Sequence, residues 1–139
     1  MSSVDQALAR LVARFSMYER PIDFINASHC CECAEHFEEL RGVSVDELRK
    51  EHVGDGAWDP TCFLTPGGFR YYLPGMCRIA TEDRHWLEML VPRLSLWYVD
   101  SLDAADREVV KTLLEAWWLD GATPEGPRLA VERALDHYQ

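Results

Sequence analysis

Residues 101–121 read SLDAADREVVKTLLEAWWLDG, and no other segment of the chain has so long a helical pattern. Its apolar residues recur at spacings of three and four, as on the buried face of an amphipathic helix. They are Val109, Val110, Leu113, Leu114, Trp117 and Trp118. Ser101 is a residue type that favours a helix N-cap, and Gly121 is typical of a helix C-terminus. The segment therefore predicts a long helix that packs against other helices.

Helical patterns also occupy most of the chain before this segment. Ser3 and Gln6 have the spacing of a capping box and predict a helix from Val4 to Glu19, which Pro21 ends. Thr65 followed by a proline is typical of another helix start. Further helices are predicted over 30–41, 45–53, 65–76 and 81–90, and a final short helix is predicted over 129–137.

Prolines set the expected limits of these helices. Pro74 should kink or break the helix that starts after Thr65, and Pro92 should end the helix over 81–90. The run from Leu94 to Val99 is short and is expected to be a connector or a helical turn. We therefore predict an all-α protein, an irregular bundle of about six helices in a single domain over 1–139.

Composition indicates a protein that folds around one core. The chain has 139 residues, of which 47% are hydrophobic and 27% are charged, close to the averages for globular domains. Its net charge of −10 would repel phosphate backbones and anionic lipids, so neither nucleic acid nor a membrane is an expected partner. The first fifteen residues contain charges and no long apolar run, so no signal peptide or membrane span is predicted and the expected location is the cytoplasm.

Residues 29–36 read HCCECAEH, which places thiols and imidazoles close together. Cys30, Cys33 and His36 have a spacing at which one helix could offer three zinc ligands. A structural site needs a fourth ligand, for which Cys62 is the first choice and Cys77 and His29 are alternatives. Two other interpretations remain open. The Cys-x-x-Cys pair could be a redox centre, or the cysteines could be small hydrophobic residues under a helix.

Motifs of the common enzyme classes are absent from the sequence. It contains no nucleophile elbow, Walker loop, dinucleotide fingerprint or His-Glu-x-x-His motif. Glu82 and His85 have di-iron ligand spacing, but the second pair that such a site needs is missing. We therefore predict no catalytic residues, and no cofactor unless the cysteine cluster holds zinc.

Aromatic residues occur as adjacent pairs at 71–72, 97–98 and 117–118. On a helix, one member of a pair can face the core while the other lies about 100° away. An exposed aromatic residue beside carboxylates would be suited to anchor a protein interface. The predicted partner-binding residues are Glu32, Glu35, Glu39, Tyr71, Trp117 and Trp118.

The sequence contains His29-Cys30-x-Glu32-Cys33, Trp58-Asp59-Pro60 and the string FLTPGGFRYYLP over 63–74. These three motifs resemble those of a bacterial family of small, functionally uncharacterised, all-helical domains. The resemblance implies a helical fold and assigns no catalytic or binding residue. The chain departs from the family pattern in having two glycines, Gly67 and Gly68, which should loosen the first turn of their helix.

These features predict an acidic cytoplasmic protein-binding module. It would block or regulate a partner that has a basic surface, as toxin-neutralising immunity proteins do. The alternatives are a small zinc-binding domain that uses Cys30, Cys33 and His36, and a thiol-redox protein.

Overall fold

The computed structural model describes residues 2–26, 31–53 and 60–139, with only the backbone for 31–34. Within these ranges the chain forms seven α-helices joined by short 3₁₀ and π-helical turns, and its one β contact is an isolated bridge between Ile25 and Leu64. The predicted all-α fold is confirmed. The helices are α1 (Ser3–Phe15), α2 (Cys31–Arg41), α3 (Lys50–Val53), α4 (Pro66–Glu82), α5 (Leu87–Pro92), α6 (Ala104–Leu119) and α7 (Glu125–Leu135).

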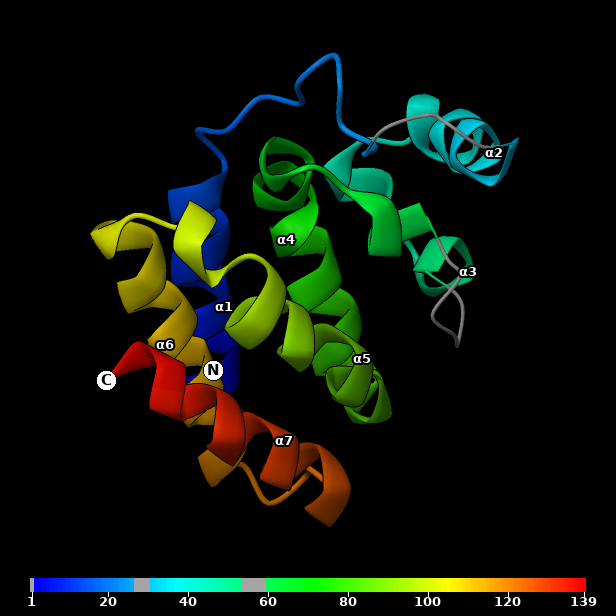
Figure 1. The fold of residues 1–139 in the computed structure, drawn as a ribbon. Helices are drawn as coiled ribbons and strands as arrows, with labels where there is room; N and C mark the ends of the chain where they lie inside the picture. Colours follow the sequence, from blue (N-terminus) through cyan, green and yellow to red (C-terminus); the bar gives the residue numbers. More distant parts are fainter. Residues whose placement is uncertain (1, 27–30, 54–59) are drawn as a thin grey trace.

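Five of these helices form the main bundle. Helix α1 packs against α4 and α6, and α7 packs against α5 and α6. Figure 1 shows α2 and α3 to one side of α4, away from α6 and α7. The largest side chains of the core are fully buried and come from several helices: Phe15, Phe69, Tyr72 and Trp117.

Helix α6 has the amphipathic face that its sequence predicts. Val110, Leu113, Leu114 and Trp117 are buried along it. The predicted N-cap at Ser101 is wrong, because Asp103 caps the helix by accepting a hydrogen bond from the Asp106 backbone at 2.8 Å. Asp103 is followed by another acidic residue at the third helical position, which completes a capping box that Ser101 lacks.

Helix α1 is shorter than its sequence pattern predicts. It is capped by Ser2 rather than Ser3, and it ends at Phe15. The side chains near its end turn toward α6 instead. Arg14 Nε and the Tyr18 hydroxyl donate hydrogen bonds of 2.9 and 2.7 Å to the buried carboxylate of Asp106, which fastens the two helices together.

A kink or a break was predicted at Pro74, and helix α4 continues through this residue without a break. Proline removes one backbone hydrogen bond, but the residues around it are buried and their packing outweighs that loss. Thr65 caps this helix as predicted, since its Oγ1 accepts a hydrogen bond from the Gly68 backbone at 3.1 Å.

Gly68 allows a close contact at the start of α4. A Cβ atom at this position would overlap the backbone carbonyl of Phe24. The segment that contains Phe24 is held there by the Thr65 backbone, which donates to the Phe24 carbonyl at 3.0 Å. The sequence predicted that Gly68 loosens the start of the helix. The structure shows in addition that close packing against Phe24 requires a glycine at this position.

The α-helical conformation of α5 ends at Pro92, as predicted, although the chain stays helical beyond it. Helix α5 continues directly into a π-helical turn, η4 (Arg93–Trp97), whose wide hydrogen bond joins the Tyr98 N–H to the Arg93 carbonyl at 3.0 Å. Because Pro92 offers no N–H, the turn before it lacks one hydrogen bond, and the chain continues as the wider turn. The predicted helical turn at this place is confirmed.

The predicted helix over 45–53 is divided into two short elements. They are a 3₁₀ turn, η1 (Val45–Glu47), and α3, and Glu47 Oε1 accepts a hydrogen bond from the Ser44 backbone at 3.1 Å. Across the described ranges, no helix has both the length and the apolar character needed to span a bilayer.

Candidate functional site

The π-helical turn η4 presents the most exposed large aromatic side chain in the described chain. Trp97 is 57% exposed, and Leu96 beside it is 67% exposed, whereas Leu94 and Tyr98 on either side are buried. Trp118 and Leu119 form another adjacent exposed pair, but Trp97 is the tryptophan that is more than half exposed, so we take its surroundings as the candidate contact site. We call Leu96, Trp97 and the groove beside Leu96 the Trp97 surface.

Trp97 is exposed, but two buried side chains lie against its ring. The guanidinium carbon of Arg93 lies 6.0 Å from the ring centroid, and the Tyr98 ring lies edge-on at 6.4 Å. Arg93 is itself buried and donates to Thr61 Oγ1 at 2.6 Å and to Cys62 Sγ at 3.2 Å. The turn that contains Trp97 is thereby tied to the 3₁₀ turn η2 (Pro60–Phe63).

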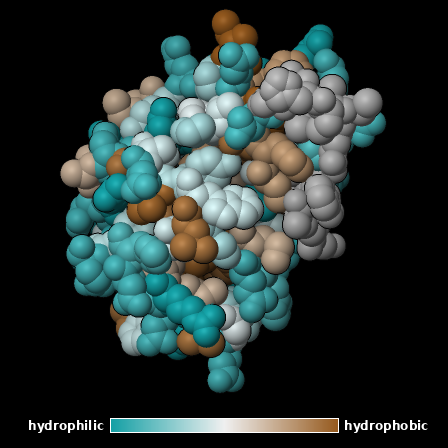
Figure 2. Space-filling model, in the orientation of Figure 1, coloured by the Kyte–Doolittle hydropathy of each residue, from teal (hydrophilic) through white to brown (hydrophobic). Residues whose placement is uncertain are grey.

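A groove with a volume of about 340 Å³ lies between the end of α5 with η4 and helix α7. Its residues are Val91, Pro92, Ser95 and Leu96 on one side and Ala130, Arg133, Ala134 and His137 on the other. Figure 2 shows apolar surface gathered in the middle of the visible face, where Figure 1 places η4 beside α7. A groove of this size is large enough for apolar side chains of a ligand.

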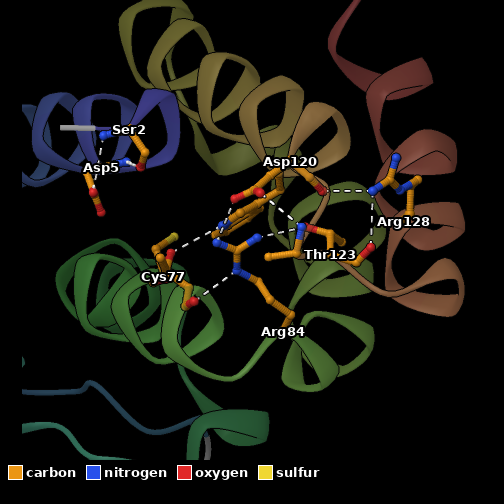
Figure 3. Close-up of polar contacts among 10 residues, drawn as sticks. Ser2, Asp5, Cys77, Arg84, Asp120, Thr123 and Arg128 are labelled. Carbon is orange, nitrogen blue, oxygen red and sulfur yellow. Dashed lines mark hydrogen bonds and ion pairs between the residues drawn. The ribbon is translucent and has the colours of Figure 1, made fainter.

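An arginine clamp holds the start of α7 and so positions one wall of the groove. Arg84 donates to Asp120 Oδ2 at 3.1 Å and to Thr123 Oγ1 at 2.8 Å (Figure 3). Arg128 of α7 donates to the carbonyl oxygens of Asp120 and Thr123 at 2.8 and 3.2 Å. The loop between α6 and α7 is thus fastened to the end of α4.

Because of this clamp, the stability of the fold should fall at acid pH. The Ala122 N–H and then Arg84 hold the pKa of Asp120 below its ordinary value of 3.8. A carboxylate with a lowered folded-state pKa stabilises the fold above its unfolded pKa, and this contribution is lost as pH falls through the folded pKa. We expect Asp120→Asn to lose less stability than the wild type between pH 5 and pH 2. Urea unfolding at each pH measures this.

The control for this experiment is Glu132→Gln, which removes an exposed carboxylate that has no ion pair among the described residues. Its stability profile should follow that of the wild type. Equal acid losses in the wild type and Asp120→Asn would show that the clamp does not depend on this charge.

The structure separates the predicted partner-binding residues into two regions. Glu35 and Glu39 are exposed on α2, and Trp118 is 38% exposed on α6, at the other side of the bundle (Figure 1). Tyr71 is half-buried, and its hydroxyl accepts a hydrogen bond from the Val45 backbone at 3.2 Å. The Glu32 side chain is outside the described atoms.

Trp117 is wrongly predicted as a partner-binding residue. Its side chain is fully buried, and its indole Nε1 donates to Thr81 Oγ1 at 3.2 Å. The physical reason is the helical period, since Trp117 follows Leu113 and Val110 on the inner face of α6. In each aromatic pair one member is buried, and these are Tyr72, Tyr98 and Trp117.

The Trp97 surface was not among the predicted sites. The sequence marks 97–98 as an aromatic pair, but nothing in the pattern shows which member faces outward. The π-helical turn settles this, because it rotates the chain differently from an α-helix. Leu96 and Trp97 in an otherwise short connector are the only signal that could have indicated the surface.

The predicted zinc ligands are described only in part. Cys30 lies outside the described residues, as does the side chain of Cys33. His36 is buried and stacks on Phe63 with ring centroids 4.8 Å apart, and Cys62 is half-buried beside Arg93. Among the described side chains no group of three or more metal-binding residues comes together. Zinc binding stays a prediction, which metal analysis of the purified protein would test.

The two described cysteines differ in their surroundings. Cys77, the alternative fourth ligand, lies in the core on α4, where burial raises the pKa of its thiol. A neutral buried thiol is a poor nucleophile and a poor metal ligand. Cys62 is the more accessible of the two, and its sulfur accepts the hydrogen bond from Arg93. Redox activity of the Cys-x-x-Cys pair stays a prediction.

Comparisons with protein-family models, with curated proteins and with solved structures find no match to this chain.

Proposed function

We propose that this protein is a protein-binding module and that Trp97 is the central contact for its partner. The observation that supports this is a tryptophan that is more than half exposed while Arg93 and Tyr98 lie against its ring. An aromatic side chain fixed in this way loses little conformational entropy when a partner covers it. Tryptophan is also among the residues that contribute most to binding free energy.

The charge of the molecule supports a partner with a basic surface. The net charge is −10, and exposed carboxylates include Glu35, Glu38 and Glu39 on α2 and Asp100 three residues after Trp97. Such a field attracts a basic protein over long distances and increases its association rate. The apolar contact at Trp97 would then supply affinity at short range.

The biological setting that we propose is the cytoplasm, where the protein blocks or regulates its partner. Neutralisation of a toxin by an immunity protein is one form of this function, because a compact acidic module can cover the basic surface of a toxin. Membership of the bacterial family that the sequence motifs resemble is also part of this proposal.

Replacing Trp97 with alanine is expected to weaken partner binding by about 30-fold, which corresponds to about 2 kcal/mol for a central aromatic contact. The partner would first be isolated on the immobilised wild-type protein at low salt and identified. Its dissociation constant for each variant would then be measured by calorimetry at several salt concentrations. Binding of the wild type should weaken as salt screens the acidic surface.

Met17→Ala is the control, since it removes a large apolar side chain that is 62% exposed just after α1 and belongs to no predicted site. It should change the dissociation constant by less than about threefold. Equal binding by the wild type and Trp97→Ala would contradict the role of Trp97. An acidic partner whose binding is insensitive to salt would contradict the proposed charge complementarity.

A further inference from the structure

Arg93 is a large cationic side chain inside the hydrophobic core. It is 2% exposed, and its guanidinium carbon lies 5.5 Å from the ring centroid of Trp86 and 6.0 Å from that of Trp97. A buried charge loses its hydration, which is costly, and replacing buried ionic groups with apolar residues of similar volume is often neutral or stabilising. An arginine at this position is therefore best explained by something that an apolar residue could not do.

Both the backbone and the side chain of Arg93 make hydrogen bonds that fix the π-helical turn η4. Its carbonyl accepts the wide hydrogen bond from the Tyr98 N–H that closes this turn. Its guanidinium donates to the buried Thr61 hydroxyl of η2 at 2.6 Å. The Tyr98 hydroxyl donates to the carbonyl of Leu64, the residue after η2, at 2.7 Å. The two side chains that lie against Trp97 are thus anchored to one short segment of the chain.

We propose that Arg93 is a positioning residue for partner binding, which fixes the Trp97 indole in the orientation that the partner contacts. This inference rests on the proposed function, because it explains how the proposed contact residue is prepared before the partner arrives. An exposed side chain that rotates freely must lose that freedom when a partner covers it, and this loss weakens binding. Because Arg93 is anchored to η2 and lies beside the indole, part of this loss has already occurred in the free protein.

The first test needs no partner, because it measures the motion of the indole itself. Arg93→Met removes the charge and the hydrogen-bond donors but keeps a flexible apolar side chain that can fill the core. The order parameter of the Trp97 indole N–H, measured by ¹⁵N relaxation, should be about 0.85 in the wild type and below about 0.6 in Arg93→Met. The indole N–H of Trp118 on α6 serves as the internal reference and should not change.

Tyr138→Phe is the matched control, because it also removes a buried hydrogen bond to η4. The Tyr138 hydroxyl donates to the Leu94 carbonyl at 2.8 Å, and phenylalanine keeps the ring. This variant should leave the order parameter of the Trp97 indole unchanged. Arg93→Lys, which keeps a cation that can donate to Thr61, should give a value between those of Arg93→Met and the wild type.

Partner binding tests the functional step. Arg93→Met should weaken binding of the isolated partner about three- to tenfold, the range expected for ordering one large side chain at an interface. In a Trp97→Ala background the same substitution should have no effect, because no indole is left to position. A general loss of stability would weaken binding in both backgrounds, so this double-mutant cycle separates positioning from a purely structural role.

Three results would overturn the positioning role of Arg93. They are a Trp97 indole that stays equally ordered in Arg93→Met, an equal loss of order in Tyr138→Phe, and a loss of binding in Arg93→Met that persists without the indole. If Arg93→Met does not fold, Arg93→Lys replaces it in every measurement, and an indole as ordered as in the wild type then overturns the role.

Failure of this inference can be distinguished from failure of the proposed function. If Trp97→Ala weakens partner binding while any of the three results holds, the proposed function survives and the role of Arg93 does not. If Trp97→Ala binds the partner as the wild type does, the proposed function fails, and the positioning role fails with it.

Discussion

Replacing Trp117 with alanine is expected to lower the free energy of unfolding by about 3–5 kcal/mol. The indole is fully buried on the inner face of α6, so its removal leaves a cavity among well-packed side chains. The substitution also removes the donor to Thr81 Oγ1. That hydroxyl itself donates to the Cys77 carbonyl at 2.8 Å, so it keeps one hydrogen bond. The lost packing is therefore the larger part of the expected effect.

Trp118→Ala gives a matched comparison at the next position of the same helix. Because Trp118 is partly exposed, we expect a loss of less than about 1 kcal/mol. Urea unfolding followed by circular dichroism at 222 nm measures both variants without depending on tryptophan fluorescence. Equal losses for the two variants would contradict the inward orientation of Trp117.

Replacing Gly68 with alanine is expected to destabilise the protein by about 2–3 kcal/mol. Alanine favours a helix over glycine by about 1 kcal/mol, so intrinsic propensity alone predicts the opposite sign. The new Cβ would overlap the Phe24 carbonyl, which is backbone and is held by the hydrogen bond from the Thr65 N–H. The start of α4 and the segment around Phe24 would have to separate.

Gly126→Ala in the first turn of α7 is the control for this prediction. Its Cβ would lie 2.7 Å from Glu88 Oε1, the end of an exposed side chain that can rotate away. We expect a gain of up to about 1 kcal/mol. If Gly68→Ala stabilises the protein as Gly126→Ala should, then the close approach of Phe24 does not constrain α4. Urea unfolding of the two variants decides between these results.

The helices themselves could be predicted from the sequence, because their signals are local. The three- and four-residue spacing in α6 predicted a buried face, and the structure buries Val110, Leu113, Leu114 and Trp117 there, while Val109 is half-buried and Trp118 is partly exposed. The N-cap at Thr65 could also be predicted, because its signal, a threonine followed by a proline, is local as well. The proline rules predicted the end of α5 at Pro92 correctly, but no break occurs at Pro74, where packing with distant helices outweighs the cost of one backbone hydrogen bond.

The candidate site depended much more on contacts between distant segments. The aromatic pair at 97–98 was visible in the sequence, but the exposure of Trp97 follows from a π-helical turn and from Arg93. Arg93 reaches Thr61 and Cys62, which are about thirty residues away in the chain. No periodic pattern encodes such a contact.

The sequence by itself determined that this protein is helical, which faces of its helices are apolar, and that its net charge is strongly negative. These properties depend on residue type and on spacing within a few turns. Only the tertiary structure decided which aromatic residue of the 97–98 pair is exposed and that α5, η4 and α7 form a groove beside Leu96 and Arg133. The reason is that surfaces and grooves arise from the packing of whole helices, and this packing is set by the combined burial of side chains far apart in the chain.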